Sequence, residues 1–313
     1  MKFKFSGHET FPCRYAWLPK AFRLLDGKPD AFVDEVQAMV DLGIGKNMFR
    51  ALRFWLQATG VAESGEGRRL DITDFGRALL RTHDPYLEDI RTLWLLHWKI
   101  ATHSDEPLFA WYHLLNAWNH PEISRTQVLP DFEKHALEST GRALSPVTLI
   151  QHYDMFIHSY VPTHHTKGTV LEDTLDCPLV ELELVQPVGD RAAAATNRRE
   201  VIYAFRRDEK PDITPALFVY TLAAFWLKHA AEEQTLSLRA LAFAPDSPGQ
   251  VFKLSEWDIR QRLHALREGP GQLFTYEETA AFQRVTRGNA FTGNQEQERE
   301  LLAAIYAEET PYA

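Results

Sequence analysis

Residues 30–59 read DAFVDEVQAMVDLGIGKNMFRALRFWLQAT, and this stretch decides the fold of the amino-terminal part of the chain. From Asp30 to Leu42, apolar residues recur at spacings of three and four, which predicts a helix with one buried stripe. The stripe comprises Ala31, Phe32, Val36, Met39, Val40 and Leu42. Gly43-Ile44-Gly45 then ends this helix, and the same period resumes from Asn47 to Thr59. Two helices joined by a tight glycine turn indicate a helix-turn-helix.

The residues after the second helix predict a wing. Gly60-Val61-Ala62-Glu63 can begin a strand, Leu70-Asp71-Ile72 alternates as a returning strand, and the glycine-rich stretch between them can form a loop. Thr73-Asp74-Phe75-Gly76 can cap a further helix, Arg77 to Arg81, because the Thr or Asp oxygen can accept from the free amides of a first helical turn. The first module is therefore predicted to be winged-helix-like.

The same order of parts recurs twice along the chain. A helical pair at Thr126–Ser139 and Ser145–Tyr160 is followed by two alternating segments, Val180–Val188 and Glu200–Arg206. A third set comprises helices at Pro215–His229 and Ser255–Arg267, strand-like pieces at Leu273–Tyr276 and Ala281–Thr286, and an acidic terminal helix at Asn294–Glu309 that either covers an apolar surface or is solvated. We predict a mainly α fold with small β-ribbons, built from tandem winged-helix-like (helix-turn-helix) modules. The expected modules span residues 1–105, 106–210 and 211–313.

The composition is that of a globular protein with an acidic balance. Of 313 residues, 45% are hydrophobic and 25% are charged, which excludes a disordered chain and a coiled-coil rod. The net charge of −9 argues against binding of nucleic acid through bulk charge but permits a local basic face. Two cysteines, Cys13 and Cys177, cannot build a four-thiolate zinc site. The apolar stretch Ala216–Leu227 is about half of the roughly 20 residues that cross a bilayer, so we expect a cytoplasmic protein without a membrane partner.

Basic side chains gather where the second helix of the quoted stretch begins. Free amides at its start and the Lys46 ammonium suit a phosphate oxygen. We interpret a groove-facing set as contacts to the DNA backbone: Lys46, Asn47, Arg50 and Arg53. In the predicted wing, Arg68 and Arg69 could reach a neighbouring phosphate or a narrow minor groove. The alternative is an ordinary turn followed by a solvated helix face and solvated loop arginines.

The amino-terminal block SGHETFPCR, residues 6–14, concentrates an imidazole, a carboxylate and a guanidinium in nine residues. His8, Glu9 and Arg14 could form a site for phosphate or metal chemistry, or a hydrogen-bonded anchor that ties the terminus to the core. The residue types favour the anchor, because buried polar groups are usually structural. The metalloprotease pattern His-Glu-x-x-His is excluded, since Pro12 stands at the place of its second histidine.

Two acidic clusters could serve a divalent metal. Glu88 and Asp89 precede an aromatic helix that contains His97; helix capping explains much of this cluster, and His97 is expected to be a hydrogen-bonded core residue. The densest cluster comprises Glu172, Asp173 and Asp176, and its carboxylates suit Mg²⁺ or Mn²⁺. A metal-assisted cut of a phosphodiester is one interpretation of this cluster, and a polar loop before a strand is the other.

Five blocks together resemble an uncharacterised-domain family of bacterial proteins that are encoded in defence islands, often beside genes resembling phosphoadenosine-phosphosulfate (PAPS) reductases. The blocks are SGHETFP at 6–12, GKNM at 45–48, DPYLED at 84–89, TLWLLHW at 92–98 and EDTLD at 172–176. No single block is diagnostic of the family, but five in the same order are fairly specific. The remainder of the chain matches in layout more than in motif.

The resemblance implies a component of DNA phosphorothioation, in which sulfur replaces a non-bridging phosphate oxygen, within an anti-phage defence system. The family member is then the subunit that engages or nicks duplex DNA, and its partners are a cysteine desulfurase, a PAPS-reductase-like protein and an ATPase. Within or beside the matched blocks, the resemblance implies the following candidate site residues: His8, Glu9, Arg14, Lys46, Asn47, Glu88, Asp89, His97, Glu172 and Asp173. The roles assigned to them are our own.

Three hypotheses remain open at this point. In the first, the protein nicks one strand, with catalytic residues drawn from His8, Glu9, Glu88, Asp89, Glu172 and Asp173 and with Mg²⁺ or Mn²⁺ as cofactor. In the second, it is a non-catalytic DNA-binding scaffold or transcriptional regulator, and substitution of the acids is tolerated. In the third, the winged helices bind other subunits through apolar faces, and binding to DNA is absent.

Overall fold

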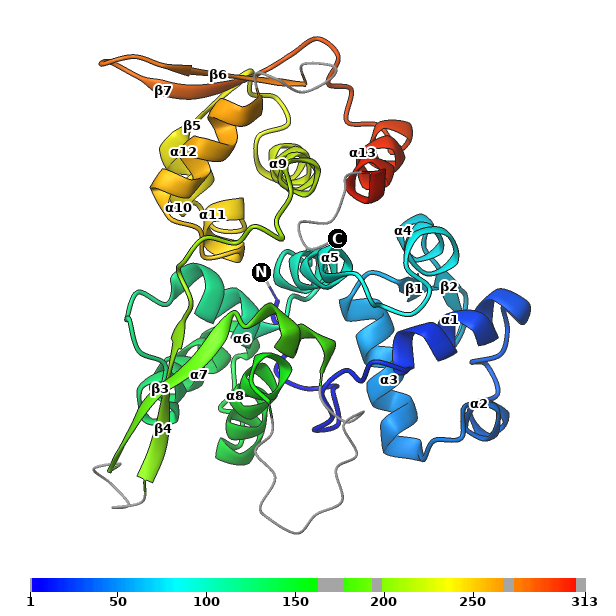
Figure 1. The fold of residues 1–313 in the computed structure, drawn as a ribbon. Coiled ribbons are helices and arrows are strands. Elements are labelled where there is room, and N and C mark those ends of the chain that lie inside the picture. Colours follow the sequence, from blue (N-terminus) through cyan, green and yellow to red (C-terminus); the bar gives the residue numbers. More distant parts are fainter. Residues whose placement is uncertain (1, 163–176, 193–198, 267–272, 308–313) are drawn as a thin grey trace. The chain divides into compact units, whose positions relative to one another are not determined.

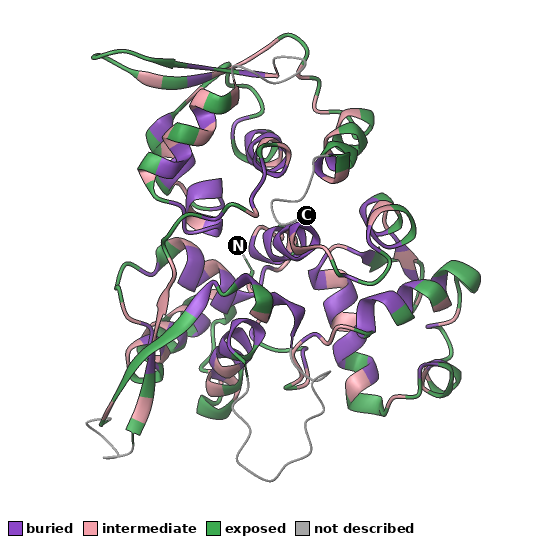
Figure 2. Cartoon of the chain, viewed as in Figure 1, coloured by how far each residue is buried: buried purple, intermediate pink, exposed green. Residues whose placement is uncertain are grey.

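The computed structural model describes residues 2–162, 177–192, 199–266 and 273–307 (Figure 1). Contacts divide the chain into two compact units. The first comprises Met1–Leu114 and Trp118–Arg206, and the second comprises Leu115–Ala117 and Arg207–Ala313. Each unit has a core of its own, visible in Figure 2 as the buried sides of its helices.

The first unit begins with three helices: α1 (Trp17–Gly27), α2 (Glu35–Leu42) and α3 (Lys46–Ala58). Gly43 ends α2 in the left-handed conformation with a φ of 66°, which glycine adopts without steric cost. α3 then packs against α1 and α2. Its buried side carries Phe49, Leu52, Trp55 and Leu56, each at most 1% exposed. The helical period of residues 47–59 therefore predicts the inner face of α3.

The predicted start of the helix before the glycine turn is wrong. The helix begins at Glu35 and not at Asp30. The Asp34 carboxylate accepts the backbone N–H groups of Val36 and Gln37, both at 3.1 Å, and so caps the helix at this point. A prediction from apolar periodicity alone does not detect a capping carboxylate that lies within the repeat.

The predicted buried stripe is also wrong in part. In the observed register Ala38 and Leu42 face inward, whereas Val36 and Val40 are 68% and 69% exposed. Phe32, which lies before the helix, is fully buried in their place. A helix of only two turns buries a narrow stripe, so two of its five apolar residues remain exposed to solvent.

An antiparallel hairpin follows α3, as the alternation of the sequence predicts. β1 (Ala62–Ser64) pairs with β2 (Leu70–Ile72). The Thr73 hydroxyl accepts the Gly76 amide at 2.9 Å and caps α4 (Asp74–Arg77). The capping oxygen is therefore the predicted one, but the helix begins at Asp74 and not at Arg77. The chain continues as the π-helical segment Ala78–His83.

The described residues of the first unit form further α-helices: α5 (Ile90–Ala101), α6 (Phe109–Tyr112), α7 (Arg125–Thr140) and α8 (Pro146–Tyr160). The π-helical segment His113–Ala117 follows α6. His97 is fully buried on α5, and its Nδ1 lies 2.7 Å from the Tyr160 hydroxyl, which also accepts the Trp111 indole N–H at 2.9 Å. His97 is therefore a hydrogen-bonded core residue, as expected.

The second ribbon of the first unit starts later than the sequence predicts. The expected strand at Val180 is a 3₁₀ turn, Pro178–Leu182, and Glu183 has a positive φ of 46° that no strand allows. β3 (Val185–Ala192) then pairs antiparallel with β4 (Arg199–Phe205), and these strands form the long green ribbon of Figure 1.

The second unit combines helices with one small sheet. Its helices are α9 (Pro215–His229), α10 (Leu238–Phe243), α11 (Pro248–Val251), α12 (Glu256–Ala265) and α13 (Gln295–Ala307). Its strands, β5 (Thr235–Ser237), β6 (Phe274–Glu278) and β7 (Gln283–Arg287), form an antiparallel sheet in the order β5-β7-β6. α13 packs on α9 and buries Leu302 and Ile305, so the terminal helix covers an apolar surface.

The described residues are mainly helical with small antiparallel ribbons, which confirms the predicted fold class at that level. In the described part of the chain, every helix is too short or too polar to cross a membrane.

Candidate nucleic-acid interface

The first turn of α3 presents polar groups to solvent. Gly45 precedes the helix in an extended conformation, and no side chain caps the amides of the first turn. Lys46, Asn47 and Arg50 are exposed, and Figure 2 shows this end of α3 at the surface while its inner side is buried. The positive end of a helix and a lysine therefore face solvent together, an arrangement that favours an anion.

The basic residues of α3 form one row along the helix. At 100° per residue, four side chains fall on the same side: Lys46, Arg50, Arg53 and Gln57. The opposite side is the buried one, so the row points away from the core. α3 contains no aspartate or glutamate. Three of the four DNA contacts that the sequence predicts on this helix, Lys46, Arg50 and Arg53, thus lie in this row, and the fourth, Asn47, lies at its edge.

Arg53 differs from the others because it is half-buried. Its Nη1 has no hydrogen-bond partner among the described residues. Burial lowers the pKa of its guanidinium, the nearby Glu35 carboxylate opposes this change, and Arg68 adds to it. This nitrogen is itself buried, so in this structure it is not open to an oxygen that arrives from solvent.

The hairpin after α3 is tied to the same face. The Gln57 amide donates to the Ser64 hydroxyl at 2.7 Å, which links α3 to β1. Arg68 is largely exposed, and its Nη1 lies 3.8 Å from Glu35. Arg69 pairs more closely with Asp71, at 2.6 Å. Exposed pairs of this kind are weak, so Arg68 can exchange its partner for a phosphate at little cost. The sequence does not predict the pairing of Arg68 with Glu35, because the two residues are far apart in the chain.

His8 is buried in the loop before α1. Its Nδ1 accepts the Thr10 amide at 3.2 Å, and its ring stacks on His152 with centroids 5.8 Å apart and 12° between the planes. Burial lowers the pKa of His8 to about 4. The carbonyl of Phe11 in the same loop accepts the Trp55 indole N–H of α3 at 2.8 Å. These contacts agree with the anchor interpretation of this block.

The backbone of this loop is unusual. Gly7, Glu9 and Thr10 all have positive φ, at 113°, 47° and 61°. Such a conformation costs about 1–3 kcal/mol for a residue with a side chain, and it persists only where contacts hold it. Glu9 is partly exposed, and the Arg14 guanidinium packs 5.5 Å from the Trp17 ring centroid.

The acids before α5 have unequal surroundings. The buried Asp84 carboxylate accepts the amides of Glu88 and Asp89 at 2.9 and 3.0 Å and so shapes the turn. Asp89 caps α5 by accepting the Arg91 amide at 2.9 Å, and it also binds the buried Arg91 guanidinium at 2.6 Å. Glu88 is exposed. Helix capping, as expected, accounts for Asp89.

The densest acidic cluster of the sequence, Glu172, Asp173 and Asp176, lies outside the described residues. Within the described ranges, no three or more histidine, cysteine, aspartate or glutamate side chains are grouped to hold a metal ion.

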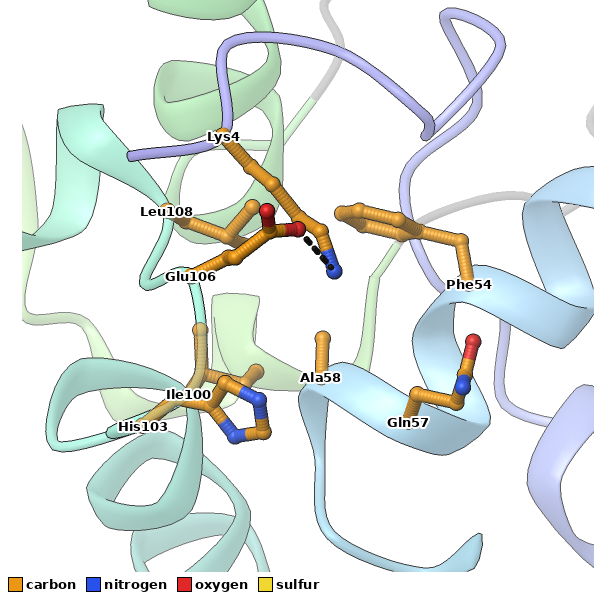
Figure 3. A pocket seen from close by; sticks show the side chains of 8 residues that line it. All are labelled: Lys4, Phe54, Gln57, Ala58, Ile100, His103, Glu106 and Leu108. Atoms are coloured by element: carbon orange, nitrogen blue, oxygen red, sulfur yellow. Dashed lines mark ion pairs between the residues drawn. The ribbon is translucent and has the colours of Figure 1, made fainter. Parts of the chain in front are cut away.

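A small pocket lies beside the second half of α3 (Figure 3). Its lining consists of Lys4, Phe54, Gln57, Ala58, Ile100, His103, Glu106 and Leu108. Lys4 and Glu106 point toward one another across it and form an ion pair of 3.4 Å. Gln57 belongs both to this lining and to the basic row, so the pocket adjoins the row. Its residues come from distant parts of the sequence, and no motif predicts the pocket.

Comparison with known proteins finds matches along almost the whole chain. A family model described as a protein of unknown function, DUF4007, matches residues 5–306. A magnesium ion-bound SspB crystal structure is similar with a TM-score of 0.82, and an SspB crystal structure is similar with a TM-score of 0.80. Each is 25% identical, and each match covers 98% of this chain and 88% of the other. No curated protein matches in sequence. By the extent of the family match, the chain belongs to the DUF4007 family.

Proposed function

We propose that this protein is the DNA-engaging component of a bacterial DNA phosphorothioation defence system, with α3 as the helix that contacts duplex DNA. Two similarities support a role in a phosphorothioation system. The ordered sequence blocks resemble a family associated with phosphorothioation, and the fold is similar to that of SspB along 98% of the chain.

The order of elements in the first unit supports the mode of contact. α1, α2 and α3 are followed by the β1–β2 hairpin, which is the order of a winged helix. In helix-turn-helix proteins the second helix of the pair lies in the major groove. Lysine and arginine side chains and helix N-termini at such interfaces contact phosphate oxygens. α3 occupies this place, and the hairpin that carries Arg68 occupies the place of the wing.

The observation that carries the proposal is the charge of α3. The chain has a net charge of −9, yet α3 has three basic and no acidic residues, and Lys46, Arg50 and Arg53 share one side of it. Burial of apolar residues explains the inner side of the helix but not this outer row. Phosphate contacts position a protein on DNA without reading sequence, so the row predicts affinity more than specificity.

Alanine substitution of Lys46 and of Arg50 tests this function. Each change should weaken binding of a labelled duplex about threefold to tenfold and reduce the slope of log affinity against log salt by about one, because each removes one phosphate contact and one released counterion. Fluorescence anisotropy between about 50 and 200 mM salt measures both quantities.

Lys134→Ala is the matched control, since Lys134 is an exposed lysine of α7 in the same unit. It should leave affinity and slope unchanged. Equal affinities for the wild type, Lys46→Ala and Arg50→Ala would rule out α3 as the contact helix.

Nicking of one DNA strand is a second candidate function. The specific observation in its favour is the similarity to a magnesium ion-bound SspB structure. We expect supercoiled plasmid to become open-circular with Mg²⁺ or Mn²⁺, and Glu172→Gln and Asp173→Asn to abolish this product without loss of DNA affinity. Absence of the open-circular product with every divalent ion at high protein concentration would leave the non-catalytic scaffold as the function.

A further inference from the structure

The pocket beside α3 encloses about 30 Å³ of free space, which is room for about one or two water-sized groups. A nucleobase or a whole nucleotide is too large for it. Its apolar walls are formed by Phe54, Ala58, Ile100 and Leu108. Figure 3 shows the Lys4 ammonium between the Glu106 carboxylate and the Phe54 ring. The pocket therefore suits a small group that is poorly hydrated and negatively charged.

The amino-terminal block, residues 6–14, holds the aromatic wall of the pocket in place. Gly7 lies directly against the Phe54 ring, since a Cβ at this position would come within 2.9 Å of the ring carbon Cδ2. The His8 ring meets Phe54 edge-on, with centroids 5.9 Å apart. The positive φ angles of Glu9 and Thr10 cost free energy, and such strain is concentrated at functional sites. Positioning of Phe54 gives this strained block a role beyond that of an anchor.

Lys4 can bind an anion without leaving a carboxylate unpaired. Its Nζ lies 3.4 Å from Glu106 and its side chain is 42% exposed, so this ion pair is weak. Glu106 also binds the Lys2 ammonium. When Lys4 turns to an anion, Lys2 therefore still neutralises the Glu106 carboxylate.

The pocket lies on the flank of α3 next to the basic row. At 100° per residue, Phe54 and Ala58 fall on the same side of the helix as Asn47, at the edge of the row. Gln57 belongs both to the row and to the pocket lining. A DNA backbone that follows the row therefore brings its phosphate groups past the pocket.

We propose that this pocket binds the sulfur atom of a phosphorothioate group in modified DNA. A phosphate oxygen is strongly hydrated, so its burial between apolar walls is costly. Sulfur is more polarisable and a weaker hydrogen-bond acceptor, and it makes favourable contacts with aromatic rings such as that of Phe54. The group keeps a negative charge, which the Lys4 ammonium neutralises. The choice of ligand rests on the proposed function, because this group is the product of DNA phosphorothioation. The protein then distinguishes the modified backbone from the unmodified one.

Two labelled duplexes of the same sequence test this inference, one with unmodified phosphates and one with phosphorothioates throughout one strand. Fluorescence anisotropy compares their affinities for the full chain at one salt concentration. The wild type should bind the modified duplex about threefold to tenfold more tightly, as expected for a sulfur–aromatic contact. Phe54→Ala removes the aromatic wall and should abolish this preference. Lys4→Met should weaken binding of the modified duplex more than binding of the unmodified one. Lys134→Met, at an exposed lysine of α7, is the matched control and should keep the wild-type preference.

The outcomes separate the sulfur pocket from the proposed function. Equal affinities of the wild type for the two duplexes would overturn the pocket and leave the DNA contact of α3 intact. A preference that persists in Phe54→Ala and Lys4→Met would show a general attraction to sulfur-containing DNA and would also overturn it. If circular dichroism shows that Phe54→Ala does not fold, Lys4→Met decides the test, because Lys4 lies at the surface. Failure of the proposed function looks different, since neither duplex would then bind and the inference would fall with it.

Discussion

Replacing Asp89 by alanine is expected to lower the free energy of unfolding of the first unit by about 3 kcal/mol. The change removes the N-cap of α5, worth about 1 kcal/mol, and the charged hydrogen bonds to a buried guanidinium, worth about 2 kcal/mol. Arg91 is only 4% exposed, so water cannot replace the lost carboxylate. Urea unfolding followed by tryptophan fluorescence measures the loss.

Two neighbouring substitutions sharpen this prediction. Glu88→Ala removes an exposed acid and should change the free energy of unfolding by less than about 0.5 kcal/mol. Asp89→Asn keeps a good capping side chain but loses the charge, so it should fall between the two. Equal stability of Asp89→Ala and Glu88→Ala would mean that Asp89 is not structural and would return it to the catalytic candidates.

Acid is expected to destabilise the first unit through His8. Burial lowers its pKa to about 4 in the folded protein, against about 6.5 in an unfolded chain. Since the folded pKa is the lower one, the unfolded chain takes up the proton first as the pH falls. The stability is therefore complete above about pH 6.5 and is lost progressively toward pH 4. At pH 4.5 the loss from His8 alone amounts to about 2–3 kcal/mol.

His152 adds to this loss. It is fully buried beside His8, and burial together with the His8 charge holds its pKa well below the usual range. Urea unfolding of the wild type and of His8→Gln at pH 7.5 and 4.5 tests the prediction. Between pH 7.5 and pH 4.5 the wild type should lose about 2–3 kcal/mol more of its free energy of unfolding than the variant. Identical losses in both proteins would show that His8 is not the titrating group.

The sequence predicts long amphipathic elements well, for a physical reason. α3 buries one side and α9 buries most of its surface, each over three or more turns. Their apolar residues therefore recur often enough for the sequence to predict both helices. Thr73 is recognised because capping is a local interaction between residues three apart.

The failures occur where a local residue overrides the period. The Asp34 carboxylate delays α2, and the left-handed backbone of Glu183 interrupts the strand expected from Val180. Neither event changes the apolar pattern, so periodicity alone cannot detect it.

The candidate sites also differ in how far the sequence predicts them. The basic row of α3 lies on one helix and can be predicted from spacing alone. Residues that are distant in sequence form the Glu35–Arg68 pair, the pocket beside Phe54 and the Arg260–Glu278 ion pair. Only tertiary structure brings them together, so no motif indicates them.

The central claim is that the outer side of α3 touches DNA, and site-specific crosslinking tests it most directly. A photoreactive amino acid at Asn47, which is exposed at the edge of the basic row, is placed in the full chain with labelled duplex, and the same group at Glu138 of α7 serves as the control. We expect a crosslinked protein–DNA product from position 47 that increasing salt removes, and none from position 138. Equal yields at the two positions, or no product from position 47 under conditions in which the protein binds DNA, would contradict the account.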